Sequence, residues 1–152
     1  MSDVVSREKR SEMMSGIRGK DTSPEMMVRS MLHKAGYRYR LHDSTLPGKP
    51  DLVFLKYNAV IFVHGCFWHR HNCNRFKWPG TRPEFWKEKL NANAKRDERH
   101  REELINEGFR ILTIWECALV GTSRTSPELL GSEVETWLKS TETDLEICGE
   151  SK

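Results

Sequence analysis

Residues 64–80 lie between two regular stretches of the sequence and follow no apolar period themselves. They hold three histidines, two cysteines and four large aromatic residues. A loop of this length inside a compact domain needs something to hold it in place. Cysteine and histidine are the side chains that zinc prefers, so this segment points first to a bound metal ion.

Four residues are the candidate ligands of that ion. Cys66, His71 and Cys73 lie within eight residues, and Cys117 comes just after a predicted strand. The spacing Cys-x4-His-x-Cys is not one of the common zinc-finger spacings. If the strand before Cys117 runs parallel to the strand before the loop, however, all four residues lie at the same end of a sheet.

Two alternatives stay open at this point. A free cysteine is often a small buried hydrophobic residue, and this explanation is favoured for Cys117 taken alone. Three cysteines and a histidine together favour structural zinc, whose binding energy would contribute to folding. The spacing does not choose between His69 and His71 as the fourth ligand. Cys148 is a poor candidate because it lies in a polar tail.

Periodicity and capping signals predict the regular elements. The pattern predicts a helix over 22–35, strands over 37–41, 51–55 and 59–63, a helix over 81–107 opened by a capping box, a strand over 109–115 and a helix over 127–138. This order indicates an α/β fold with a mixed sheet flanked by helices. We expect a basic N-terminal arm over 1–20, a single domain over 21–139 and a mobile polar tail over 140–152.

The charge distribution suggests where a polyanion would bind. Residues 1–101 hold 21 Lys and Arg against 11 Asp and Glu, whereas residues 102–152 hold 4 against 11. The first part therefore carries any such surface, although a solvated surface of uneven charge is an equally common explanation. No apolar run approaches the roughly 20 residues that span a bilayer. Since the N-terminus also lacks a signal-peptide layout, we expect a cytoplasmic, nucleoid-associated protein.

Asp51 is the candidate catalytic carboxylate. It follows Pro47-Gly48-Lys49-Pro50 and begins a strand whose predicted partner ends at His64, so Asp51 and His64 are expected to lie close together. Phosphodiester hydrolysis needs a magnesium ion to neutralise the phosphate oxygens and a base to activate water. A carboxylate at a strand end can hold magnesium, and a nearby histidine can be the base. An Asp after a proline is also an ordinary turn residue.

Several motifs carry a family resemblance. Pro47-Gly48-Lys49-Pro50-Asp51 resembles the Pro-Asp motif of the restriction-endonuclease superfamily, but the next strand lacks that superfamily's acid and lysine. The absence of that acid and lysine, together with four further motifs, makes the sequence resemble the very short patch repair (Vsr) endonucleases. These are bacterial enzymes that nick DNA beside the thymine of a T·G mismatch. These motifs are His64-Gly65-Cys66-Phe67-Trp68-His69-x-His71-x-Cys73, Thr81-Arg82-x-Glu84-Phe85-Trp86, Asn93-x-x-Arg96-Asp97 and Trp115-Glu116-Cys117. The resemblance covers residues 10 to about 138 and implies a restriction-endonuclease-like fold.

The resemblance implies roles for the residues of both candidate sites. The active-site residues it implies are Asp51 as magnesium ligand, His69 as general base, His64 and Asp97 as their partners, and Glu25 in the outer shell. The zinc ligands it implies are Cys66, His71, Cys73 and Cys117. Val63 stands where the family is expected to have threonine. If the family uses that residue's backbone carbonyl on magnesium, valine keeps it.

A DNA-binding surface is implied in the same way. Aromatic rings on a metal-pinned loop could wedge between base pairs, and a mismatched step opens more cheaply. The family assigns this wedge to Phe67, Trp68 and Trp86, with Met14 entering from the opposite groove. The helix over 81–107 presents a stripe that could read base edges, formed by Lys89, Asn93 and Arg96. Arm cations that could contact phosphates are Arg7, Lys9, Arg10 and Arg18. Alternatively, the aromatic residues belong to the hydrophobic core, and the stripe on the helix is a solvated face.

Taken together, the sequence predicts a monomeric endonuclease that nicks double-stranded DNA 5′ to the thymine of a T·G mismatch. Such mismatches arise when 5-methylcytosine is deaminated, so the predicted process is very short patch repair, with other mismatch-repair proteins as further partners. The predicted cofactors are structural Zn²⁺ and catalytic Mg²⁺. Two alternatives remain: a restriction-type nuclease of the same fold with another target, and a non-catalytic zinc-containing DNA-binding module.

Overall fold

A five-stranded mixed sheet forms the centre of the molecule. The computed structural model describes residues 22–73 and 75–149. In spatial order the strands are β1 (Arg40–Leu41), β2 (Leu52–Phe54), β3 (Ala59–His64), β4 (Arg110–Trp115) and β5 (Asp144–Ile147). The β1–β2 and β2–β3 pairs are antiparallel, whereas β3–β4 and β4–β5 are parallel. Because β3 and β4 run parallel, the loop after β3 and Cys117 after β4 lie at the same sheet end.

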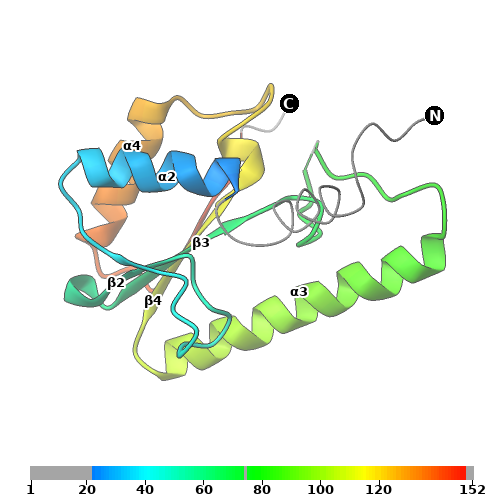
Figure 1. The fold of residues 1–152 in the computed structure, drawn as a ribbon, viewed down its shortest axis with the longest axis horizontal. Helices are drawn as coiled ribbons and strands as arrows, with labels where there is room; N and C mark the ends of the chain where they lie inside the picture. Colours follow the sequence, from blue (N-terminus) through cyan, green and yellow to red (C-terminus); the bar gives the residue numbers. More distant parts are fainter. Residues whose placement is uncertain (1–21, 74, 150–152) are drawn as a thin grey trace, which may run out of the picture.

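Helices cover both faces of this sheet (Figure 1). α2 (Ser23–Lys34) and α4 (Pro127–Leu138) lie on one face, and the long α3 (Pro83–Asn106) runs across the other. Alternate residues of each strand supply the two apolar cores: Leu112 and Ile114 pack with α2 and α4, whereas Ile111 packs with Leu104 of α3. The predicted α/β class, with a mixed sheet flanked by helices, is confirmed.

The predicted start of α2 is confirmed, but that of α3 is wrong in its detail. The Thr22 hydroxyl accepts a hydrogen bond from the Glu25 N–H at 3.4 Å, as expected for a helix cap. No such cap forms at α3, where Arg82 has a φ of 53° and makes no side-chain cap bond. Proline disfavours the helical conformation in the residue before it, so α3 begins at Pro83 instead of Thr81.

The first predicted strand is shorter than expected. Residues 37–39 are not in the sheet: the pairing of β1 with β2 covers only Arg40 with Val53 and Leu41 with Leu52, and a 3-10 turn follows β2 at Leu55–Tyr57. The side chains of Tyr37 and Tyr39 nevertheless pack against the core as the alternating pattern indicated. The Tyr37 hydroxyl lies 3.2 Å from Glu135 Oε1, and that of Tyr39 donates to the Arg29 carbonyl at 2.8 Å.

The polar tail expected from residue 140 contains a strand. Residues 144–147 form β5, which pairs parallel with β4, so the prediction of a mobile tail is wrong for this stretch. Leu145 and Ile147 alternate with Asp144 and Glu146, and both apolar side chains pack onto the main core. Four alternating residues within an acidic segment were too short a pattern to indicate a strand.

Two further points bear on the sequence predictions. The N-terminal arm over residues 1–20, with Met14 and its cations, lies outside the described residues. Across residues 22–73 and 75–149, none of the helices combines the length and the hydropathy that a membrane crossing requires.

Candidate active site and metal centre

The four candidate zinc ligands come together at the end of the parallel strand pair. Possible ligand atoms of Cys66, His71, Cys73 and Cys117 all lie within 4.8 Å of one another. His71 Nδ1 is 3.6 Å from the Sγ atom of Cys66 and 3.6 Å from that of Cys117. Ligands of a tetrahedral zinc ion are about 3.5 Å apart, so the donor set and its geometry fit zinc.

The surroundings of this Cys/His group hold its members in place. The His71 ring stacks on Trp115, with centroids 4.0 Å apart, and the Gly149 N–H donates to Cys117 Sγ at 3.2 Å. Burial raises the pKa of the thiols of Cys66 and Cys117. A bound cation would reverse this shift, because metal ligation requires the thiolate form.

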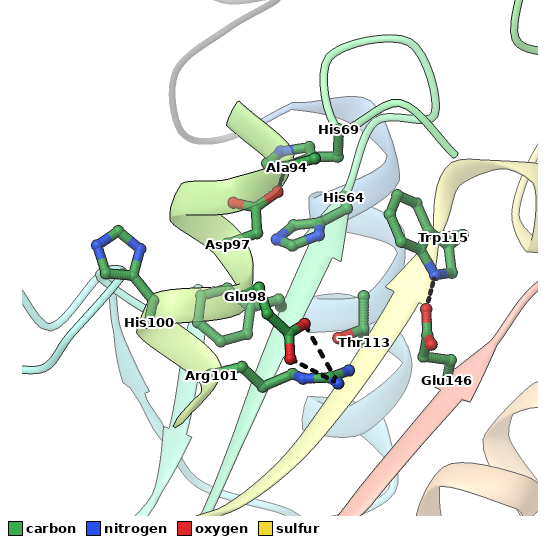
Figure 2. A pocket seen from close by; sticks show the side chains of 12 residues that line it. His64, His69, Ala94, Asp97, Glu98, His100, Arg101, Thr113, Trp115 and Glu146 are labelled. Carbon is green, nitrogen blue, oxygen red and sulfur yellow. Dashed lines mark hydrogen bonds and ion pairs between the residues drawn. The ribbon is translucent and has the colours of Figure 1, made fainter. Parts of the chain in front are cut away.

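His69 belongs to a second group, with His64 and Asp97 (Figure 2). His69 Nδ1 lies 2.5 Å from Asp97 Oδ2 on α3, and the His69 ring stacks on His64 with centroids 3.7 Å apart. Burial, followed by the nearby His69 and His71, lowers the pKa of His64 well below its usual range. His64 Nδ1 is buried and has no hydrogen-bond partner among the described residues.

This second group opens into a cavity of about 310 Å³ between α3 and the sheet. Its lining includes His64, His69 and Asp97, together with Arg101 of α3 and Glu146 of β5. Glu146 of β5 accepts a hydrogen bond from Trp115 Nε1 at 2.7 Å. The unexpected fifth strand therefore contributes to the wall of the site.

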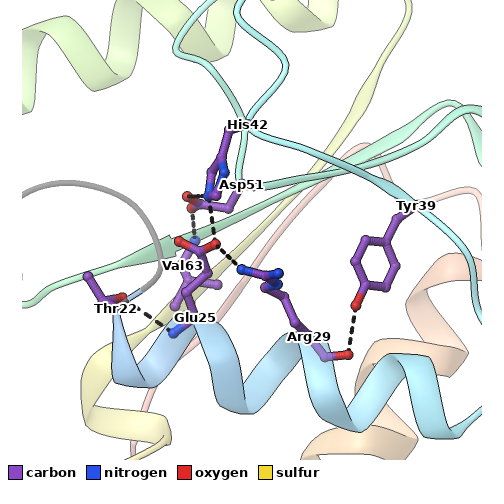
Figure 3. A network of polar contacts seen from close by, with 7 residues as sticks. All are labelled: Thr22, Glu25, Arg29, Tyr39, His42, Asp51 and Val63. Atoms are coloured by element: carbon purple, nitrogen blue, oxygen red, sulfur yellow. Dashed lines mark hydrogen bonds and ion pairs between the residues drawn. The ribbon is translucent and has the colours of Figure 1, made fainter. Parts of the chain in front are cut away.

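A third group, formed by Glu25, His42 and Asp51, lies on the α2 side of the sheet (Figure 3). Asp51 Oδ2 accepts the Val63 N–H at 2.7 Å, and His42 Nε2 lies 2.6 Å from Glu25 Oε2. Burial raises the pKa of Asp51 to about 7, with the charge of Glu25 acting in the same direction and the Val63 hydrogen bond opposing it.

The second and third groups meet at the last two residues of β3. Val63 and His64 are neighbours whose side chains point to opposite faces of the strand, and Asp51 is bonded to the Val63 backbone. Asp51 therefore contacts the backbone of the residue next to His64, as expected, but the side chains of Asp51 and His64 lie on opposite faces of the sheet. The sheet end offers one group that could hold a cation and another that could accept a proton.

The predicted aromatic wedge forms one cluster of rings. Phe67 lies 5.0 Å from Trp68 and 5.4 Å from Trp86, and Trp68 lies 5.9 Å from Trp86, between centroids. All three side chains are half-buried. The Asn93 amide donates to the Trp68 carbonyl at 3.1 Å, so Asn93 holds the wedge loop against α3. On the same stripe Lys89 is half-buried and Arg96 is exposed.

His42 and Glu146 were missed by sequence reasoning. His42 lies in a polar loop with no motif around it. If the pairing of β1 with β2 is continued by one residue, however, His42 falls opposite Asp51, and the His42 N–H indeed donates to the Asp51 carbonyl at 3.1 Å. Antiparallel pairing of the two predicted strands could have indicated this position. No sequence signal indicated Glu146, because its strand was not predicted.

The mixed sheet, the Cys/His group and the two carboxylate–histidine groups define an α/β domain with three side-chain groups that could hold metal ions. The family model described as DNA mismatch endonuclease Vsr matches residues 2–75. The chain is 43% identical to the DNA mismatch endonuclease Vsr of Escherichia coli (strain K12) over 150 residues, which are 99% of this chain and 90% of that relative.

Two further relatives are type II nicking enzymes. The chain is 47% identical over 119 residues to V.XorIIP of Xanthomonas oryzae pv. oryzae, covering 78% of this chain and 88% of the relative. It is 44% identical over 119 residues to V.NmeAIP of Neisseria meningitidis serogroup A, covering 78% of this chain and 85% of the relative. The chain belongs to the Vsr family of DNA mismatch endonucleases, as its motifs indicated.

Proposed function

We propose that this protein nicks one strand of double-stranded DNA 5′ to the thymine of a T·G mismatch. In this proposal Asp51 binds the magnesium ion and His69 is the general base. The observation that carries the proposal is that both groups involve the last two residues of β3. Asp51 accepts a hydrogen bond from the Val63 N–H, and the next residue, His64, belongs to the group that contains His69 and Asp97. The relatives are named as a mismatch endonuclease and as nicking enzymes, which supports single-strand cleavage at a mismatch.

The residues around Asp51 suit a divalent cation. Asp51 supplies a carboxylate, Val63 supplies a backbone carbonyl that does not depend on its side chain, and Glu25 is buried beside them. A cation would favour the charged form of Asp51, which burial otherwise disfavours. Magnesium bound there would neutralise the phosphate oxygens of the scissile group.

His69 is suited to take a proton from water. The Asp97 carboxylate accepts the Nδ1 proton of His69, which leaves the Nε2 lone pair available as the base. Once His69 is protonated, the same carboxylate stabilises the positive ring. His64 stacks flat on His69 and is held neutral by burial, so its role is to position the His69 ring.

Zinc in the Cys/His group would be structural, because four protein ligands fill a tetrahedral site and leave no position open. Phe67 and Trp68 lie between the ligands Cys66 and His71, so the ion would fix the rings that we propose to insert at the mismatch. Trp86 contacts both rings and extends the wedge to α3. Along α3, Lys89 and Arg96 are proposed to contact the DNA.

The test substitutes Asp51 with the isosteric Asn. Asp51→Asn removes the charge that would hold magnesium, and metal activation is worth several kcal/mol of transition-state stabilisation, so nicking should fall by about 10³-fold or more. Binding of the T·G duplex without magnesium should change by less than about threefold. The measurement compares nicking of end-labelled T·G, T·A and C·G duplexes, with Asp43→Asn, a turn carboxylate bonded to Thr45, as the matched control.

Each result has a defined consequence. Nicking by Asp51→Asn at the wild-type rate would show that the catalytic assignment is wrong. Cleavage of both strands of matched duplexes by the wild type would identify a restriction-type nuclease with another target. No cleavage of any duplex in magnesium would identify a DNA-binding module.

A further inference from the structure

His42 is held beside the proposed magnesium site by the backbone. It follows β1 directly, and its N–H donates to the Asp51 carbonyl at 3.1 Å. Its φ is 46°, in the left-handed region that residues other than glycine rarely adopt. The register and this local turn together put the His42 ring next to the residues that we propose to bind magnesium.

The three side chains converge on a small, mostly buried volume (Figure 3). His42 Nε2 lies 2.6 Å from Glu25 Oε2 and 3.9 Å from Asp51 Oδ1. The His42 side chain is 11% exposed and that of Glu25 is 2% exposed. The residues come from three places in the fold: the first turn of α2, the end of β1 and the start of β2.

These distances fit ligands of a single ion. Adjacent ligands of a six-coordinate ion with bonds of about 2.1 Å are about 3 Å apart, and opposite ligands are about 4.2 Å apart. The contacts at 2.6 and 3.9 Å lie close to this range. Arg29 Nη1 lies 3.5 Å from Glu25 Oε2 and offsets part of its charge, so cation binding would depend more on Asp51 and His42.

We propose that His42 is a third side-chain ligand of the catalytic metal site, beside the carboxylates of Asp51 and Glu25 and in addition to the Val63 backbone carbonyl, and that its imidazole gives the site a preference for Mn²⁺ over Mg²⁺. Mg²⁺ prefers oxygen ligands, whereas divalent transition metals also accept imidazole nitrogen. This inference rests on the proposed function, since it takes Asp51 as the site of the catalytic cation.

A second chemical explanation leads to a different result. If His42 only donates an N–H to Glu25, it positions that carboxylate and touches no ion. Gln is the informative replacement, because its amide can still donate to Glu25 but offers no imidazole nitrogen. His42→Gln therefore separates ligation from positioning.

The test uses zinc-loaded, full-length protein and measures metal binding directly. Mn²⁺ binding is followed by the electron paramagnetic resonance signal of free Mn²⁺, and Mg²⁺ binding by competition. Nitrogen coupling to bound Mn²⁺ is recorded by pulsed resonance. Wild type, His42→Gln and Asp51→Asn are compared, with His33→Gln, an exposed histidine on α2, as the matched control.

The expected result has two parts. His42→Gln should weaken Mn²⁺ binding by about tenfold or more, weaken Mg²⁺ binding by less than about threefold, and lose a nitrogen coupling that His33→Gln retains. Equal affinities and an unchanged nitrogen signal in His42→Gln would overturn the inference, as would a wild type that binds no Mn²⁺. If Asp51→Asn still binds Mn²⁺ as the wild type does, it is the proposed magnesium site itself that fails.

Discussion

A left-handed turn at Arg70 separates the roles of two neighbouring histidines. The φ of Arg70 is 50°, a conformation that turns the chain between His69 and His71. His69 therefore faces Asp97, whereas His71 faces the cysteine sulfurs. The spacing alone left both histidines open as metal ligands; the geometry agrees with the assignment that the family resemblance implied.

At this scale we predict that Asp97→Asn disables the proposed base without unfolding the protein. The amide keeps the shape of the side chain but cannot stabilise a protonated His69 with a negative charge. Nicking of a T·G duplex under single-turnover conditions should fall by about 10²- to 10⁴-fold. Glu102→Gln, an exposed carboxylate on the same helix, should behave as the wild type. An Asp97→Asn rate within about threefold of the wild-type rate would contradict the role given to Asp97.

At the level of elements, β5 connects the C-terminal segment to both proposed sites. Glu146 bonds to Trp115, the ring on which His71 stacks, and the Gly149 N–H bonds to Cys117 Sγ. Gly149 is packed tightly at this point, because an added Cβ would lie 2.4 Å from the Cys117 carbonyl oxygen and 2.7 Å from that of Ser123. Both are backbone atoms and cannot rotate away.

We therefore predict that Gly149→Ala loosens the contact between the C-terminal segment and the Cys/His group. The substitution should lower the free energy of unfolding by about 1–3 kcal/mol, the usual cost of overpacking. Zinc, if bound as proposed, should pass more quickly to a chelator. Denaturant unfolding and chelator kinetics measure the two effects. Gly80→Ala is the control, since an added Cβ there meets nothing within 4 Å. Equal stability of the two variants would show that the contact is dispensable.

Across the whole molecule, the Cys/His group joins segments that are distant in sequence. Cys66, His71 and Cys73 follow β3, Cys117 follows β4, and α3 lies between them in the chain. The same loop is tied to α3 by the Asn93–Trp68 and His69–Asp97 contacts. An ion at this point would thus stabilise the sheet end, the proposed base and the aromatic wedge together.

The prediction at this scale concerns two cysteines of the same chain. Cys117→Ser should purify with less than one zinc per molecule, a lower melting temperature and weaker T·G binding, because the ion would fix the wedge loop. Cys148→Ser should keep one zinc and the wild-type melting temperature, since Cys148 is exposed and outside the group. Metal analysis and thermal unfolding provide the measurements. A stable, zinc-free wild type would contradict the structural role of zinc.

Local features of the fold followed directly from the sequence. The start of α2 depends on Thr22 and Pro24, and the strand over 59–63 depends on its apolar run. Both signals involve residues that are close together in the chain. Parallel pairing of β3 and β4 was an assumption in the sequence argument, and the structure confirms it. This pairing brings Cys117 to the same sheet end as Cys66 and Cys73, whereas the choice of His71 over His69 came from the family resemblance.

The sequence by itself thus determined the main elements, the proximity of Asp51 and His64, and the Cys/His group at one sheet end. Only the tertiary structure decided that residues 144–147 form a strand, that His42 reaches Glu25, and that Asn93 holds the Trp68 loop. The physical reason is range. Periodicity and capping depend on residues a few positions apart, whereas these contacts join residues 17 to 33 positions apart and depend on strand register and on how α3 packs across the sheet.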